Sequence, residues 1–235
     1  MTSSSRGYSF SQKYRLRALG GCSLVFVSVL LSAFFALGFG AISIPYADIA
    51  AILLSPGNGS ESIDAISRKV IIDLRLPRLI LAFLAGAGLS LAGAVLQTVT
   101  RNPLADPYLF GISSGASFGA VLVIAAASGS GALLAEYGFY DLGITAGAFL
   151  GSTISVLLVV SLSGMGTQIE RMLLAGVAVS FMFSAATSLV LYLADPQAVA
   201  SLIFWTLGSF TKAHWGSLLF PSLVVLFCML IFLGN

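Results

Sequence analysis

The chain has 235 residues, of which 58% are hydrophobic and 9% are charged, and its formal net charge at pH 7 is +2. A soluble domain carries about a quarter of its residues as charged side chains, so this composition excludes an ordinary soluble domain and indicates a protein built for lipid. Basic patches interleaved with aromatic residues are absent from the sequence, which also excludes a nucleic-acid-binding protein.

Long uncharged stretches divide the chain into predicted transmembrane helices. Six of them hold an apolar run of the ~20 residues that a helix needs to cross the hydrocarbon core. Helices are expected because a backbone in lipid must satisfy its own hydrogen bonds. The predicted spans cover residues 21–42, 79–100, 108–129, 142–164, 172–193 and 217–235. The predicted fold class is an all-α polytopic membrane protein. A shorter apolar stretch, Ala198 to Phe210, predicts a short helix that is either re-entrant or at the membrane surface.

The N-terminal tail is basic and fixes the predicted orientation. Arg6, Lys13, Arg15 and Arg17 precede the first apolar run. A cleaved signal peptide is the alternative, but the run is long for one and ends without a clear cleavage site. Because basic residues stay on the cytoplasmic side, residues 1–20 are predicted to be a cytoplasmic tail and residues 21–235 a single transmembrane domain.

This orientation puts the segment of about 43–78 on the outer side, where basic residues are usually scarce. The segment nevertheless carries four of them: Arg68, Lys69, Arg75 and Arg78. One interpretation is a tolerated exception, because Glu61, Asp64 and Asp73 partly neutralise the segment. The other is that the basic residues dock an acidic partner outside. Composition alone leaves both open.

Glycines recur every fourth residue in two predicted spans, which places them on one helical face. They are Gly111, Gly115 and Gly119 in one span and Gly143, Gly147 and Gly151 in the other. A similar small stripe, Gly86, Ser90 and Ala94, lies in the second span. Close helix packing is favoured over a lined pathway for these residues.

The sequence lacks the usual signs of chemistry. It contains no P-loop for ATP phosphates, and no predicted span carries a carboxylate at its middle, as an ion-coupled carrier usually would. His214 is the only histidine and cannot form a metal site alone. Cys22 and Cys228 are interpreted as packing residues. We therefore predict no catalytic residues, no cofactor and no metal in this chain, and place any ATP hydrolysis in a partner.

Several motifs occur in order between about residues 70 and 235. They are Arg75-Leu-Pro-Arg78, the glycine-rich run 86–97, Arg101-Asn-Pro-Leu-Ala-Asp-Pro107, Gly111-Ile-Ser-Ser-Gly-Ala116, Arg171-Met-Leu-Leu-Ala-Gly-Val-Ala178 and Phe204-Trp-Thr-Leu-Gly-Ser209. Together they resemble the FecCD/BtuC-type permease family, the membrane subunits of ABC importers for iron siderophores, haem and vitamin B12.

The resemblance implies a ten-helix type II ABC importer permease in the inner membrane, of which this chain would supply the first six helices. It also implies a homodimer or a paired heterodimer, two ATP-binding subunits that hold ATP and Mg²⁺, and an extracytoplasmic substrate-binding protein. Because relatives continue for about four more helices, the chain is expected to be truncated and not to transport by itself.

The same resemblance implies two functional segments. Arg75 and Arg78 would pair with glutamates of the binding protein. Asn102 and Leu104 would belong to a cytoplasmic gate, together with Ile169 and Glu170. The last two depart from the family pattern, in which some relatives have small hydroxyl residues, so Glu170 could instead be simply solvated.

The leading functional prediction is a permease subunit for iron chelates, siderophore or haem, that works by alternating access as a homodimer in membrane lipid. The alternatives are a vitamin B12 permease, an ion-coupled secondary carrier, and a membrane subunit with a structural or regulatory role. The choice of substrate is expected to lie mostly in the binding protein.

Overall fold

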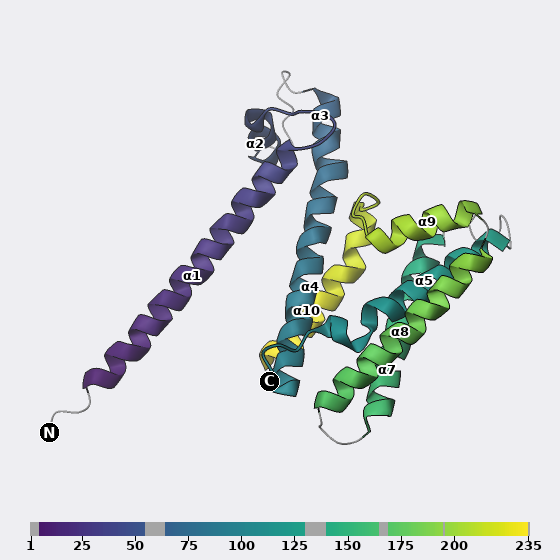
Figure 1. The fold of residues 1–235 in the computed structure, drawn as a ribbon. Helices are drawn as coiled ribbons and strands as arrows, with labels where there is room; N and C mark the ends of the chain where they lie inside the picture. The colour runs from purple at the N-terminus through teal and green to yellow at the C-terminus, as the bar shows by residue number, and fades with distance from the viewer. Residues whose placement is uncertain (1–4, 55–63, 130–139, 165–168, 195, 235) are drawn as a thin grey trace. The chain divides into compact units, whose positions relative to one another are not determined.

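The computed structural model describes residues 5–54, 64–129, 140–164, 169–194 and 196–234, and every regular element in these ranges is a helix (Figure 1). The elements are α1 (Ser5–Gly38), α2 (Tyr46–Leu54), α3 (Ala65–Lys69), the π-helix η1 (Val70–Arg75), α4 (Leu76–Thr100), the 3₁₀-helix η2 (Pro107–Phe110), α5 (Ile112–Gly129), α7 (Tyr140–Ser163), α8 (Ile169–Leu193), α9 (Pro196–Leu207) and α10 (Trp215–Gly234). The all-α prediction is confirmed for this part of the chain.

Within the described ranges, five helical segments are long and apolar enough to cross a membrane. They are Leu19–Gly38, Ala65–Thr100, Asp141–Ser163, Ile169–Leu193 and Trp215–Gly234. Each overlaps one of the six predicted spans. The short helix expected near 198–210 is present as α9.

The predicted span over 108–129 differs from the structure because the chain breaks at Gly111. This residue has φ +66°, a left-handed conformation that an ordinary residue adopts only at a cost, and it separates η2 from α5. The 18 residues of α5 therefore rise about 27 Å, slightly less than the ~30 Å hydrocarbon core. Ile112–Ala127 accordingly counts among the shorter apolar helices.

The predicted outer segment 43–78 is mostly helical where the structure describes it. It contains α2, and from Ala65 the chain runs through α3, η1 and α4 to Thr100 without a non-helical residue. Thirty-six helical residues extend about 54 Å, far more than the hydrocarbon core. The end of this helix that carries Arg68, Lys69, Asp73, Arg75 and Arg78 can therefore project beyond the lipid.

The helices expose apolar side chains. Leu24 on α1, Phe149 on α7 and Phe181 on α8 are 72%, 68% and 72% exposed. In water such continuous surfaces would drive association. They suit a protein whose surroundings are hydrocarbon, which supports a multi-pass membrane protein.

The chain divides into two compact units. The first unit comprises Met1–Leu84 and Thr211–Leu223, and its core is built from α1, α2 and η1. Leu37, Ile44, Ile49, Ile52 and Ile71 are its buried residues. The rings of Phe34 and Phe35 pack against Tyr46 with centroid distances of 5.7 and 5.5 Å, which fastens α2 to the end of α1.

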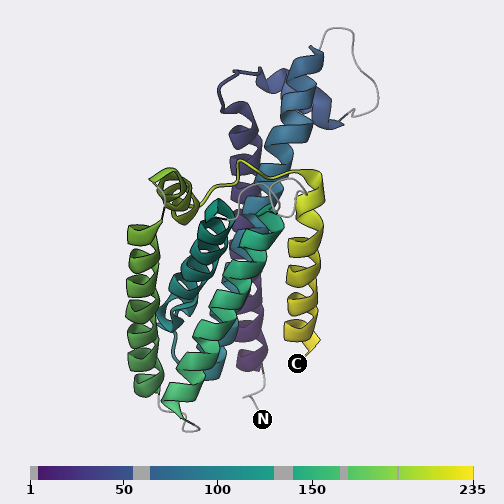
Figure 2. The same ribbon diagram turned by 90° about the vertical axis from the view of Figure 1, so that its right-hand side faces the viewer.

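The second unit comprises Ala85–Phe210 and Val224–Asn235. In it α5, α7 and α8 run side by side, and α9 lies crosswise near their end (Figures 1 and 2). Ala120, Val121 and Ile124 of α5 pack with Ile144 of α7 in one buried cluster. A second cluster joins Phe110 of η2 to Val159 of α7 and to Val179 and Phe183 of α8.

Candidate functional site

The guanidinium of Arg75 is engaged inside the first unit. It donates hydrogen bonds from Nη1 to the backbone carbonyl of Leu37 and from Nη2 to that of Ile42. A Cβ at Gly40 would lie 2.6 Å from Nη2, so any other residue there would require the guanidinium to shift. The carbonyl of Leu37 belongs to the last turn of α1, where carbonyls lack intrahelical donors and attract cations. Arg75 therefore joins η1 to the end of α1.

The π-helix η1 is held from a second side. The indole Nε1 of Trp215, the first residue of α10, donates to the carbonyl of Ile72 at 3.2 Å. A π-helix has one residue more in its turn than an α-helix has, and such turns often occur at functional sites. This π-helix was not predicted from the sequence, because nothing in the residues of Val70–Arg75 distinguishes the segment from an ordinary α-helix.

Arg78 lies in the first turn of α4 and is half-buried. Its Nε is buried and has no hydrogen-bond partner among the residues that the structure describes. A buried donor without a partner costs free energy, which a bound carboxylate could recover. The two arginines of the Arg75-Leu-Pro-Arg78 motif therefore differ: one is engaged with backbone carbonyls and the other has an unused donor.

The predicted gate residues Asn102 and Leu104 lie in a tightly bonded turn between α4 and η2. The Oδ1 of Asn102 accepts from the backbone N–H of Leu104 at 2.9 Å, and Ala105 N donates to Asn102 O at 3.1 Å. Arg101 begins the turn with φ +50°. Leu104 is 82% exposed at its tip. The turn thus presents an apolar side chain from a backbone that its own hydrogen bonds fix.

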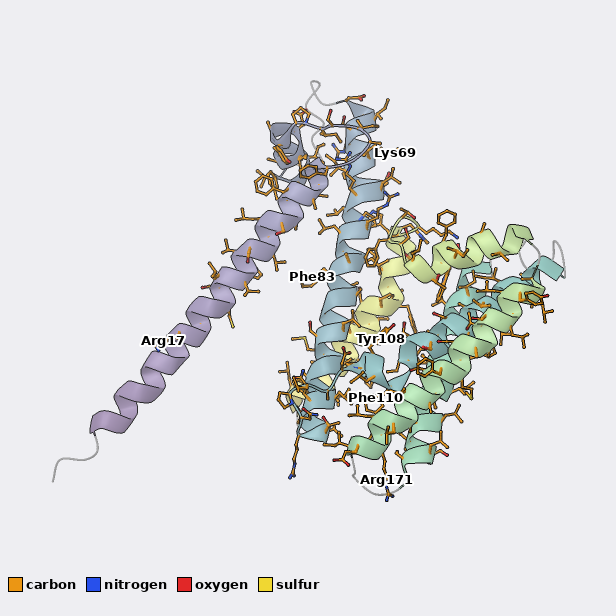
Figure 3. The ribbon with its side chains drawn as sticks, viewed as in Figure 1. Arg17, Lys69, Phe83, Tyr108, Phe110 and Arg171 are labelled. Atoms are coloured by element: carbon orange, nitrogen blue, oxygen red, sulfur yellow. The ribbon has the colours of Figure 1, made fainter. Side chains whose placement is uncertain are left out.

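The turn continues into η2, which is anchored to α7 and α8. Asp106 Oδ1 accepts from Tyr108 N at 2.9 Å and caps the 3₁₀-helix. Phe110 enters the buried cluster with Val179, whereas Tyr108 is exposed (Figure 3). The carbonyl of Leu109 lies so close to Gly176 of α8 that a Cβ there would clash with it.

Ser155 of α7 completes this anchor and was not singled out from the sequence. Its side chain is fully buried and its Oγ lies 2.8 Å from Gly111 O and 3.1 Å from Phe110 O. Gly111 O also accepts from Gly115 N at 2.9 Å, so Ser155 adds a bond from α7 to the backbone on either side of the break before α5. A signal was available, because Ser155 continues the four-residue spacing of Gly143, Gly147 and Gly151.

The other predicted gate residues begin α8. Ile169 is half-buried, and Glu170 is exposed in the first turn, where a negative charge is favourable. No hydrogen bond joins them to Asn102 or Leu104, all four being described residues. The gate role stays a prediction for both segments. Residues 165–168 of the connection lie outside the described ranges.

Four of the six predicted packing glycines bring α5 and α7 into close contact. A Cβ at Gly115 would lie 2.5 Å from Gly151 O, and one at Gly147 would lie 2.7 Å from Gly119 O. Gly111 instead serves the left-handed break. A Cβ at Gly143 would meet Val123 Cγ1 at an ordinary 3.5 Å, so this residue does not need to be glycine for packing.

A cavity of about 500 Å³ in the second unit is almost entirely apolar. Its lining comes from α4, η2, α5, α7, α8 and α10 and includes Leu96, Phe110, Val160, Met172 and Cys228. Such a lining offers no general acid, base or nucleophile pair. The predictions of no catalysis and no resident metal or cofactor in this chain stay predictions.

Comparisons with known proteins give a consistent result. A model of the FecCD transport family matches residues 27–235. The molybdate import system permease protein MolB of Haemophilus influenzae is 33% identical over 219 residues, covering 93% of this chain and 61% of MolB. The hemin transport system permease protein HmuU of Yersinia pestis is 37% identical over 156 residues, covering 66% of this chain and 45% of HmuU.

The vitamin B12 import system permease protein BtuC of Vibrio parahaemolyticus is 35% identical over 182 residues, covering 75% of this chain and 52% of BtuC. A solved structure described as an inward-facing ABC transporter of the metal-chelate type matches with a TM-score of 0.69 and 32% identity, over 93% of this chain and 61% of the solved one. The chain thus spans less than two thirds of the length of these proteins.

Proposed function

Because this chain belongs to the FecCD transport family, we propose that it acts as the membrane-spanning permease part of an ABC importer in the inner membrane. The observation that carries the proposal is the family match over residues 27–235, together with relatives that are named as import permeases. ATP and Mg²⁺ would be bound by a separate ATP-binding subunit, and two permease subunits would form a homodimer.

The proposed substrate is an iron chelate, siderophore or haem. Vitamin B12 remains an alternative. Molybdate is a further candidate, because MolB matches 93% of this chain. The apolar lining of the cavity and the bundle offers few polar groups that could select among these, which supports selection by an extracytoplasmic binding protein.

The proposed orientation has a cytoplasmic N-terminus and the helical segment 65–78 outside. A binding protein with acidic lobes would dock there, and Arg75 and Arg78 are its predicted contacts. Arg78 is supported by its unpaired buried Nε. Arg75 uses two of its five N–H donors on backbone carbonyls, so other donors remain for a partner.

The proposed mechanism is alternating access by movement of packed helix groups. The close glycine contacts between α5 and α7 and the anchor of η2 on α8 support a bundle that moves as a body, since such contacts do not tolerate sliding. The exposed Leu104 on its fixed turn would act at the cytoplasmic gate, with Asn102 shaping the turn. Ile169 and Glu170 would belong to the second gate segment, before α8.

Reconstitution tests the function. The full protein, co-expressed with its ATP-binding subunit and placed in proteoliposomes, should hydrolyse ATP faster when the loaded binding protein is added on the outer side. Substrate should accumulate only with nucleotide. Accumulation driven by an ion gradient without ATP would instead support the secondary carrier, and absence of both accumulation and stimulated hydrolysis would support a structural or regulatory subunit.

A further inference from the structure

The four cations of the outer segment differ in what they contact. Arg75 uses two of its N–H donors on the carbonyls of Leu37 and Ile42. The side chains of Arg68 and Lys69, by contrast, form no hydrogen bond or ion pair to any residue that the structure describes. Lys69 is exposed and Arg68 is half-buried. Two neighbouring positive charges are thus left available on the same helix.

The π-helix accounts for this division. Arg68 and Arg75 are seven residues apart, about two turns, and would share one face of a regular α-helix. The π-helical turn of η1 contains one residue more than an α-helical turn. This extra residue rotates the position of Arg75 by about 100° around the helix axis relative to Arg68. Arg75 can therefore reach the end of α1, while Arg68 and Lys69 lie on another part of the helix surface.

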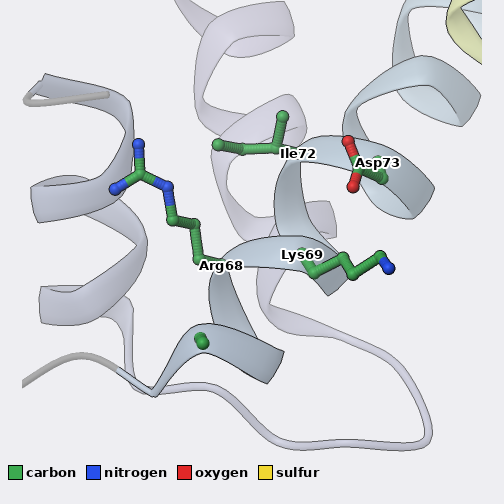
Figure 4. Close-up of a pocket in the computed structure, with 5 residues that line it drawn as sticks. Arg68, Lys69, Ile72 and Asp73 are labelled. Atoms are coloured by element: carbon green, nitrogen blue, oxygen red, sulfur yellow. The ribbon is translucent and has the colours of Figure 1, made fainter. Parts of the chain in front are cut away.

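Arg68 and Lys69 lie on either side of an open hollow of about 250 Å³ (Figure 4). Ala65, Ile72 and Asp73 complete its lining. The backbone below it is fixed, because Ile72 O accepts the indole N–H of Trp215 and Asp64 Oδ1 accepts from Ile66 N. A fixed hollow between two available cations suits a protruding carboxylate side chain.

We propose that Arg68 and Lys69 form an additional docking contact for acidic side chains of a folded protein partner, and that Arg75 is a positioning residue that holds the platform below them. The inference rests on the proposed function, which puts this segment outside. The partner is a protein rather than a lipid surface, because Asp73 lines the same hollow. A surface of lipid phosphates carries only negative charge there and would be repelled by Asp73. A protein can place a basic group opposite Asp73 and carboxylates opposite Arg68 and Lys69.

The test measures binding of the extracytoplasmic binding protein to the full transporter in nanodiscs. Arg68→Glu with Lys69→Glu should raise the apparent Kd about tenfold and flatten its salt dependence, because exposed charge pairs are screened by salt. The unfolding midpoint should not change, since neither side chain has a partner among the described residues. Arg68→Lys with Lys69→Arg is the matched control and should keep the affinity.

Arg75→Ala should behave differently and lower the unfolding midpoint without any binding protein present, with Arg75→Lys restoring part of it. If the double reversal leaves the Kd unchanged while Arg78→Gln weakens binding, this inference is wrong and the proposed docking stands. If neither changes the Kd, docking on this segment fails too. If the double reversal leaves the Kd unchanged but abolishes the rise in unfolding midpoint that phosphatidylglycerol gives the parent protein, the two residues bind lipid headgroups and the inference is wrong.

Discussion

Single glycines set the distance between α5 and α7. Gly147→Ala should destabilise the protein by about 1–3 kcal/mol, because the added Cβ would lie 2.7 Å from the backbone oxygen of Gly119, which cannot turn aside. Thermal unfolding of the purified protein in detergent measures this.

Gly143→Ala is the matched control, one turn away on the same helix. Its Cβ would meet Val123 Cγ1 at 3.5 Å, and alanine is the better helix former by about 1 kcal/mol. The variant should therefore be neutral or slightly stabilised. Equal losses of stability in both variants would contradict close backbone contact as the reason for Gly147.

Arg78 is predicted to contact the binding protein directly. Arg78→Gln should weaken the binding protein about tenfold, since one close charge pair contributes on the order of 1.5 kcal/mol at an interface. Equilibrium binding at low salt is the measurement. Arg101→Gln removes the same charge just beyond the other end of α4 and should have no effect; a similar loss there would point to nonspecific attraction.

Among the elements, the turn between α4 and η2 depends on the cap that Asp106 provides for η2. Asp106→Ala removes the acceptor for Tyr108 N and should cost about 1 kcal/mol, the usual value of a helix cap. Asp106→Asn keeps an oxygen acceptor and should be close to the parent in an unfolding experiment. Destabilisation of both variants by the same amount would mean that the charge, and not the cap, matters.

The break at this element could have been read from the sequence. Asp106 before Pro107 is a helix-start signal, and Gly111 is a typical helix-stop residue. The prediction of one continuous helix over 108–129 did not take these two signals into account. The anchor by Ser155 was less accessible. Its partners are 44 and 45 residues away, and no local pattern specifies them.

At the scale of the whole molecule, we predict that the segment 65–78 faces the outside and that the turn with Leu104 faces the cytoplasm. In a background without Cys22 and Cys228, Ile66→Cys should react with a membrane-impermeant maleimide from outside intact cells, and Leu104→Cys only after permeabilisation. Both parent side chains are well exposed, at 62% and 82%, so access depends on the side of the membrane. The reverse pattern would place the basic segment in the cytoplasm and remove the basis for docking.

The sequence by itself determined that this chain is helical and membrane-spanning, where most helices lie and to which family it belongs. Those properties depend on local composition, because apolar runs must form helices in lipid wherever they occur. Only the tertiary structure decided how the motif residues are used. That Arg75 bonds the end of α1 while Arg68 and Lys69 stay available, and that Gly147 but not Gly143 needs to be glycine, depends on which backbones meet, and spacing along one helix carries no information about its neighbour.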